Sequence, residues 1–195
     1  MKPTLLREPR SGLTTATASA SPITKIGASS TAGTTTYTAT TVRDATAWDL
    51  SALTAGQIAL GIWAVTTEGY RGYVTAANDA SDQVTIAGGW ITPSGYQLDP
   101  NIATELPTTA TAVTFHRVSF CKTLVVTGYA GNTNTIYCGY NSALPSDGSD
   151  GDEIAASVVK AYIGDLLDAT KLYVICAAGS PKISWTASDL SLIHI

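Results

Sequence analysis

The feature that most constrains the fold is the regular alternation of short β-branched or apolar segments with turn residues. Segments 58–65, 70–76 and 83–87 are rich in Val, Ile, Thr and Tyr, and turns that contain Gly, Asn and Asp separate them. Strands of about five to eight residues with a turn signal about every ten residues are typical of small barrels and sandwiches. The sequence therefore predicts an all-β chain.

Composition narrows the class of protein further. The chain has 195 residues, of which 45% are hydrophobic and only 13% are charged, and its formal net charge is −4. The charged fraction is too low for a disordered chain, and helical proteins are richer in Glu, Lys and Leu. A general nucleic-acid-binding protein needs a basic surface, which the net charge argues against. The composition favours a β protein whose surface contacts other proteins.

Signals for secretion or membrane insertion are missing from the sequence. Residues 1–10 carry charge, but no apolar run follows them, so we expect no secretory signal. No apolar stretch reaches the ~18 residues that a transmembrane helix requires. We therefore expect no membrane partner.

Changes in composition predict how the chain is organised. Residues 1–29 are expected to form an extended arm and residues 30–93 a small β-barrel-like domain. Residues 94–110 are expected to be a connector and residues 111–188 an antiparallel β-sandwich. Residues 189–195 are interpreted as an apolar C-terminal arm.

The expected strands are short and rich in β-branched residues. Segment 158–162 also has the i, i+4 apolar spacing of a helix, but its β-branched residues and the nearby Gly164 favour a strand. Single helical turns are expected at 49–53 and 165–168. Further strands are expected at 35–42, 111–115, 118–127, 135–140, 156–163, 171–177 and 182–186.

The sequence contains no pattern typical of an enzyme active site. His116 and His194 are interpreted as ordinary surface or interface residues, because no G-x-S-x-G elbow accompanies them. P-loop, H-E-x-x-H and G-x-G-x-x-G sequences do not occur. The acidic run 147–153 is interpreted as a solvated turn, with a weak calcium site or a subunit contact as the alternative. We expect no enzyme activity, no cofactor and no metal.

Three cysteines, Cys121, Cys138 and Cys176, lie far apart without the spacing of a zinc site. We interpret them as buried thiols that pack like small hydrophobic residues. The alternative is a disulfide, because a tight turn at 129–130 would place Cys121 opposite Cys138, with Cβ atoms ~5 Å apart. The alternative position for that turn is segment 132–134.

Aromatic residues cluster in the barrel-like domain. Trp63, Tyr70, Tyr73, Trp90 and Tyr96 fall within one stretch, so they are candidates for a strip that binds sugar or peptide. Aromatic residues in strands more often pack a core or an interface, because each buries ~150–250 Å². Core packing is therefore the favoured interpretation and a ligand strip is the alternative.

The last residues of the sequence are apolar, whereas free termini are normally polar. Leu190, Leu192, Ile193 and Ile195 together would gain roughly 6–10 kcal/mol on burial, at ~1.5–3 kcal/mol per side chain. We expect this segment to contact a neighbouring subunit by strand addition. The alternative is that it closes the edge of its own sandwich.

Segment 56–90 is similar to small barrel modules of tailed-bacteriophage head and neck proteins, in which a strand, a glycine turn, a G-x-V strand and a D-x-V-T-V strand follow in order. Segments 135–139, 172–180 and 182–185 resemble sandwich modules of phage decoration and spike proteins. Modules of this second kind have a plain apolar residue where Cys138 and Cys176 stand here, which leaves a redox or cross-linking role open.

The resemblance implies a non-enzymatic virion structural subunit, either a capsid decoration (cement) protein or a neck-collar component, assembled in the host cytoplasm and located in the virion. The implied partners are other virion proteins and further copies of the chain, with a trimer favoured and with no nucleic acid or membrane. The alternative is a carbohydrate- or receptor-binding module of a phage fibre or adhesin that uses the aromatic residues between Trp63 and Tyr96.

Overall fold

The computed structural model describes residues 10–101, 105–118 and 120–189, and it divides them into two compact units. The first unit contains the described residues from Lys25 to Arg117, and the second contains residues 10–24 together with the described residues from Val118 onward. Strands make up 45% of the structure and helices 6%, and every strand pair is antiparallel. The predicted all-β class is confirmed.

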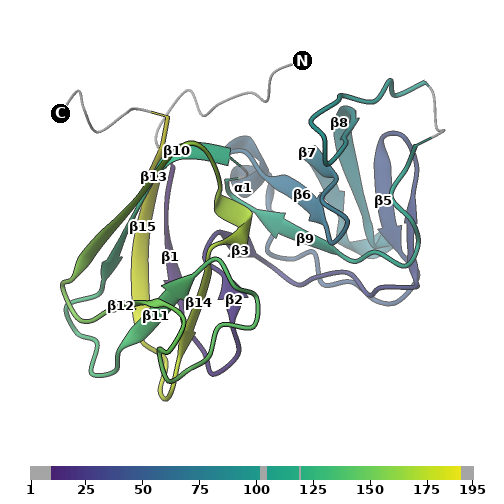
Figure 1. The fold of residues 1–195 in the computed structure, drawn as a ribbon. Coiled ribbons are helices and arrows are strands. Elements are labelled where there is room, and N and C mark those ends of the chain that lie inside the picture. Colours follow the sequence, from purple (N-terminus) through teal and green to yellow (C-terminus); the bar gives the residue numbers. More distant parts are fainter. Residues whose placement is uncertain (1–9, 102–104, 119, 190–195) are drawn as a thin grey trace. The chain divides into compact units, whose positions relative to one another are not determined.

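The first unit is a seven-stranded antiparallel sheet, sheet C, in the order β3-β9-β6-β7-β8-β5-β4 (Figure 1). Its strands are β3 (Lys25–Ile26), β4 (Thr35–Tyr37), β5 (Thr41–Asp44), β6 (Trp63–Thr66), β7 (Arg71–Asn78), β8 (Gln83–Ile91) and β9 (Val113–His116). Its helical elements are α1 (Ala55–Ala59) and the 3₁₀ turn η1 (Asp79–Ser81). In the described residues β3 and β4 lie at opposite ends of this order, so a closed barrel is not established.

Sheet C surrounds an aromatic and aliphatic core. Trp90, Phe115 and Ile86 are among its fully buried side chains, and Trp48 stacks on Phe115 with ring centroids 5.1 Å apart. The longest strands, β7 and β8, form a hairpin whose turn is set by Asp82 in the left-handed region, with φ of 51°. Two irregularities in the β7–β8 register bend this hairpin, which lets one face close over the core.

The second unit is a sandwich of two four-stranded antiparallel sheets (Figure 1). Sheet A has the order β1-β15-β10-β13 and sheet B the order β12-β11-β14-β2. One hydrophobic cluster, which includes Leu124, Val126, Ile136, Val174 and Trp185, draws on both sheets. The strands are β1 (Arg10–Thr15), β2 (Ser21–Pro22), β10 (Phe120–Gly128), β11 (Ile136–Gly139), β12 (Asp152–Ile154), β13 (Val159–Asp168), β14 (Tyr173–Cys176) and β15 (Lys182–Ser188), with a 3₁₀ turn η2 at Ala169–Lys171.

Residues 10–24, expected to belong to an extended arm, are part of the sandwich. β1 pairs with β15 along its whole length, and its residues alternate between half-buried and exposed. The indole nitrogen of Trp185 donates to the hydroxyl of Thr14 at 3.2 Å. Residues 1–9 lie outside the described residues, so the arm prediction is not addressed there. The period-two alternation of β1 is what the prediction of an arm overlooked.

The boundary between the units also differs from the predicted one at 111. β9 pairs with β6 of the first unit, and the second unit resumes at Val118. A predicted strand carries no information about which sheet it joins, and this pairing links segments about 50 residues apart in sequence.

Local predictions fail where helix and strand signals overlap. A helical turn is expected at 165–168, but these residues form the end of β13, and the helical turn η2 comes directly after them. α1 occupies residues 55–59, because the Thr54 hydroxyl caps it by accepting from the amide of Gln57, so the strand expected from residue 58 begins only at Trp63. Segment 49–53 contains a turn in which the amide of Leu53 donates to the carbonyl of Leu50 at 2.8 Å.

Candidate functional site

The aromatic residues singled out in the first unit do not form one exposed strip. Trp90 is fully buried, and its indole nitrogen donates to the carbonyl of Thr38 at 3.0 Å. Trp63 and Tyr73 form an edge-to-face pair with centroids 5.5 Å apart, and Tyr70 is half-buried against the core. Tyr96 is 70% exposed. The favoured interpretation of core packing therefore holds for Trp90 and Tyr70. The five aromatic residues do not form one continuous strip that a ligand could contact.

The three cysteines are free thiols in the core of the sandwich. Cys121 on β10 pairs with Leu167 on sheet A, whereas Cys138 on β11 lies in sheet B, so a hairpin does not place them opposite each other. Burial raises the pKa of the Cys121 and Cys138 thiols to about 12. Such thiols remain protonated and unreactive at neutral pH, which agrees with the interpretation of buried thiols.

The remaining sequence candidates have structural partners. His116 is buried, not at the surface as expected, and its Nε2 lies 2.9 Å from the Thr114 hydroxyl. In the acidic run 147–153, Asp152 pairs with Lys160 at 2.7 Å. The described part of the chain contains no group of three or more His, Cys, Asp or Glu side chains arranged to hold a metal ion. His194, Leu190, Leu192, Ile193 and Ile195 lie outside the described residues, so docking of the C-terminal segment stays a prediction.

Among the described carboxylates of the first unit, Asp44 accepts the most hydrogen bonds. It accepts from the amide of Thr31 at 2.6 Å, the hydroxyl of Thr34 at 2.6 Å, and both the amide and the hydroxyl of Thr46. Burial alone would raise its pKa, but these hydrogen bonds outweigh burial and lower the pKa to about 2. Asp44 therefore stays ionised and organises the segments that flank β4 and β5.

We expect Asp44→Asn to destabilise the first unit by about 1–2 kcal/mol at pH 7, allowing for screening by nearby solvent. Because the folded pKa of Asp44 is depressed, this stabilisation is complete above the unfolded pKa of about 4 and is lost as the pH falls toward 2. Thermal unfolding at pH 7 and pH 2.5 measures it. The stability difference between the two proteins should be full at pH 7 and mostly lost at pH 2.5, and Asp165→Asn, at an exposed position, is the control.

The outer face of sheet A, which points away from sheet B, carries no charged side chain between Lys182 at the start of β15 and Asp165 on β13, both of which are exposed. We define it by two rows of laterally paired residues and one further position. Leu13 and Val159 end the first row and are 59% and 61% exposed, and Ile163 on β13 is 60% exposed. The first row is Leu13, Ser184, Thr127 and Val159, and the second row is Ser11, Thr186, Val125 and Ala161. The further position is Ile163 on β13.

β13 is one of the two edge strands of sheet A, and β1 is the other. In the described residues the hydrogen-bonding partner of β13 on sheet A is β10, and its other side pairs with no strand. Natural edge strands are commonly protected by lysine or proline. Inward-pointing charges and bulges protect an edge too, and β13 has one of each: Lys160 points inward and pairs with Asp152 at 2.7 Å, and the register with β10 shifts after Ile163. On the outer side of residues 159–163 there is no lysine or proline, and Val159 and Ile163 are exposed. An unpaired backbone edge thus adjoins an apolar surface.

Sequence reasoning identified β13 as a strand but not as an edge. The signal was present in the spacing of Val159, Ala161 and Ile163, which share one face of the strand. Because that alternation is equally typical of a strand facing a core, the sequence could not show that these side chains point outward.

Comparison with protein-family models, with curated protein sequences and with solved structures gives no match for this chain. Among the described residues the longest helix, α1, has 5 residues, and no helix there is long enough to cross a membrane.

Proposed function

We propose that this chain is a non-enzymatic structural subunit of a tailed-bacteriophage virion, which decorates or cements the capsid or neck through β contacts between subunits. The observation that carries the proposal is the outer face of sheet A with its open edge at β13. The assignment to a virion rests on the resemblance of segment 56–90 and of the sandwich segments to phage modules.

The edge strand and the face provide complementary kinds of contact. Addition of a neighbouring strand to β13 would satisfy the unpaired backbone groups over residues 159–163. The same neighbour would cover Val159 and Ile163, whose burial releases up to ~1.5–3 kcal/mol each. Because Lys182 and Asp165 stand at the margins of the rows, a neighbour can approach the rows themselves with little of the desolvation cost that charged groups impose.

The size of the face suits a repeated array better than an isolated pair. With strands about 4.8 Å apart and residues about 3.4 Å apart along each strand, the outer face covers roughly 200–300 Å². Stable pairwise interfaces bury about 800 Å² per partner. Contacts this small gain strength when a shell presents many of them together, and such a shell is the assembly that the proposal assigns.

The test is incorporation of the Ile163→Lys variant into particles. A buried lysine on the outer face leaves an unpaired charge in the contact, so we expect at least a tenfold drop in copies per virion, measured by quantitative mass spectrometry of purified particles. Tyr96→Lys, at a 70% exposed position of the first unit, is the control and should incorporate normally.

Unfolding temperatures of both variants, measured on the free chain, should match that of the wild type, because both side chains are already exposed. Normal incorporation of Ile163→Lys would refute the role of the β13 edge. Absence of the wild-type chain from purified virions would refute the virion assignment itself.

A further inference from the structure

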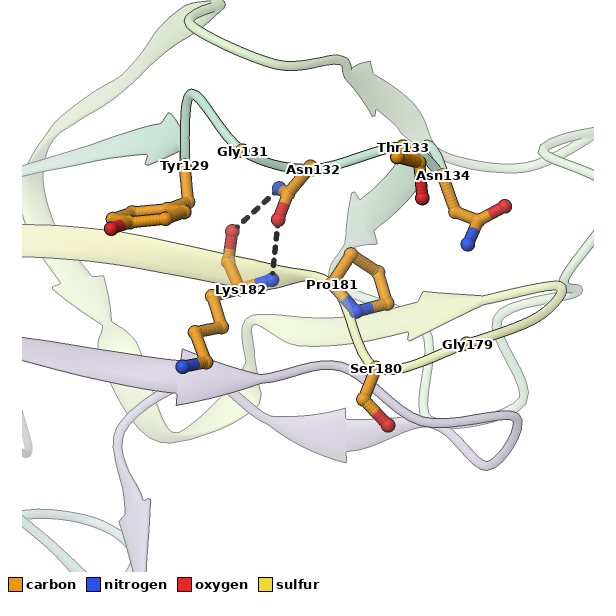
Figure 2. A pocket seen from close by; sticks show the side chains of 9 residues that line it. All are labelled: Tyr129, Gly131, Asn132, Thr133, Asn134, Gly179, Ser180, Pro181 and Lys182. Carbon is orange, nitrogen blue, oxygen red and sulfur yellow. Dashed lines mark hydrogen bonds between the residues drawn. The ribbon is translucent and has the colours of Figure 1, made fainter.

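A hollow of about 320 Å³ opens between two loops at one end of the sandwich (Figure 2). One wall is the β10–β11 loop, which contributes Tyr129, Asn132 and Asn134, and the other is the β14–β15 loop with Ser180 and the first residue of β15, Lys182. In Figure 2 the Tyr129 ring lies at one end and the Asn134 amide at the other, with Asn132 between them. The volume lies at the lower end of the ~300–1,000 Å³ typical of ligand pockets.

The two loops are held together by a side-chain clamp. The amide nitrogen of the Asn132 side chain donates to the carbonyl of Lys182 at 2.7 Å, and the backbone amide of Lys182 donates to the Asn132 side-chain oxygen at 2.8 Å. The backbone amide of Tyr129 donates to the same Lys182 carbonyl at 3.0 Å. Asn132 thus takes the place of a paired strand residue, and the hollow is formed before any ligand arrives.

Gly179 allows the second loop to approach the first. Its φ of +74° is in the left-handed region, and a Cβ atom there would lie 2.6 Å from the amide nitrogen of Asn134. A larger residue would displace Asn134 from the rim of the hollow. The position of the Asn134 amide therefore depends on glycine at 179.

Apart from Asn132, the polar side chains that line the hollow are not used by the fold. Within the described residues the hydroxyls of Tyr129 and Ser180 and the side-chain amide of Asn134 have no hydrogen-bond partner, and the Lys182 ammonium has no ion pair. Tyr129 is 56% exposed, so its ring face is open to solvent. The aromatic face at one end of the hollow and the unpaired amide, hydroxyl and ammonium groups along the two loops together favour polar rings over an apolar ligand.

We propose that this hollow binds an acidic sugar unit of a polysaccharide. The Tyr129 ring packs against the C–H face of one pyranose, and the Asn134 amide, at the other end of the hollow, donates to and accepts from hydroxyls of the next sugar unit. Ser180 adds a further hydroxyl contact. Lys182 pairs with the sugar carboxylate, which selects uronic-acid units over neutral hexoses. The site lies on different loops from the aromatic cluster that the sequence pointed to, and it does not depend on assembly into a virion.

The test is titration of the purified chain, followed by NMR, with a tetrasaccharide of alternating glucuronic acid and N-acetylglucosamine. We expect a Kd of about 0.1–1 mM, weak as for a small exposed site, with shifts confined to residues 129–134 and 179–182. Neutral cellotetraose should bind at least fivefold more weakly. Failure of the acidic tetrasaccharide to bind at millimolar concentration, or equal binding of both, would overturn the proposal.

Two variants assign the roles of the side chains. Tyr129→Ala should weaken binding at least tenfold, and Lys182→Gln should remove the preference for the acidic tetrasaccharide while its backbone clamp to Asn132 persists. Tyr96→Ala, at a 70% exposed position of the first unit, is the matched control. Unchanged binding by Tyr129→Ala, or loss of binding in the control, would contradict the assigned site. Because no particle is involved, this result is separate from that of the incorporation experiment.

Discussion

Replacement of Trp90 by alanine is expected to destabilise the first unit by about 3–5 kcal/mol, the range for loss of a large buried aromatic side chain. Trp90 is fully buried, and Tyr37 packs edge-on against it with ring centroids 5.7 Å apart. Its removal leaves a cavity and also leaves the Thr38 carbonyl without its 3.0 Å donor. Trp90→Phe keeps most of the volume but not the hydrogen bond, so it should cost less.

Thermal unfolding and hydrogen exchange measure the effect of Trp90→Ala. A loss of 3 kcal/mol lowers the unfolding temperature of a unit of this size by roughly 12–24 °C. The loss of exchange protection should concentrate in peptides from β8, which contains Trp90, and from β5 and β7, which pair with β8. Tyr96→Ala is the control, and a Trp90→Ala protein as stable as the wild type would contradict the core assignment.

Trp90→Ala is not a suitable variant for testing ligand binding by the aromatic residues of the first unit. If binding of any ligand were lost in Trp90→Ala, the loss would report unfolding and not a missing contact, because the indole is buried. A strip defined by proximity in the sequence mixes both faces of strands, since successive side chains point to opposite sides. In β7 and β8 that alternation exposes Tyr73 and buries Trp90.

The parts of the fold that depend on local sequence could be predicted. The strand expected at 83–87 lies within β8, and the strand expected at 70–76 lies within β7 except for its first residue, Tyr70. The turn between the two strands is set by Asn78 and Asp82. Asn and Asp form such turns because their side chains bond to nearby backbone and tolerate the left-handed region. These signals act within a few residues, so they can be seen without knowledge of the fold.

The pairing of strands could not be predicted in the same way. β1 and β15 lie at opposite ends of the described chain, yet Arg10 pairs with Ala187 and Thr15 with Lys182. Their alternation shows that each has one inner face but contains nothing that selects the partner. For the same reason β9 is assigned to the first unit only by its register with β6 and β3.

The hollow at the end of the sandwich combines loops about 50 residues apart, which the sequence alone does not bring together. A signal did exist, because the polar Asn-Thr-Asn sequence at 132–134 and the Gly-Ser-Pro sequence at 179–181 both mark turns. Such signals identify each turn but do not show that the two turns lie next to each other. That Asn132 bonds to the backbone of Lys182 requires the sheet A register, which places the two loops at one end.

The second large effect is expected from Gly128→Ala in the sandwich. Gly128 is buried at the end of β10, and a Cβ atom there would overlap the backbone carbonyl of Ala155. The Ala155 carbonyl accepts from the amide of Val158 at 3.1 Å, and the amide of Ser157 donates to the Gly128 carbonyl at 3.0 Å. An added methyl group therefore meets main chain that is itself fixed by hydrogen bonds and cannot move aside as a flexible side chain would.

We expect Gly128→Ala to destabilise the second unit by about 3 kcal/mol, at the upper end of the range for overpacking, with fluorescence of Trp185 and hydrogen exchange in β10 and β13 as the measurements. Gly56→Ala is the matched control. Its Cβ atom would have no neighbour closer than 4.0 Å, and Gly56 lies within α1, where alanine stabilises by about 0.5–1 kcal/mol. If Gly128→Ala, like Gly56→Ala, left the stability unchanged or raised it, the packing of the 155–158 turn against β10 would be wrong. That packing sets where β13 starts as the open edge.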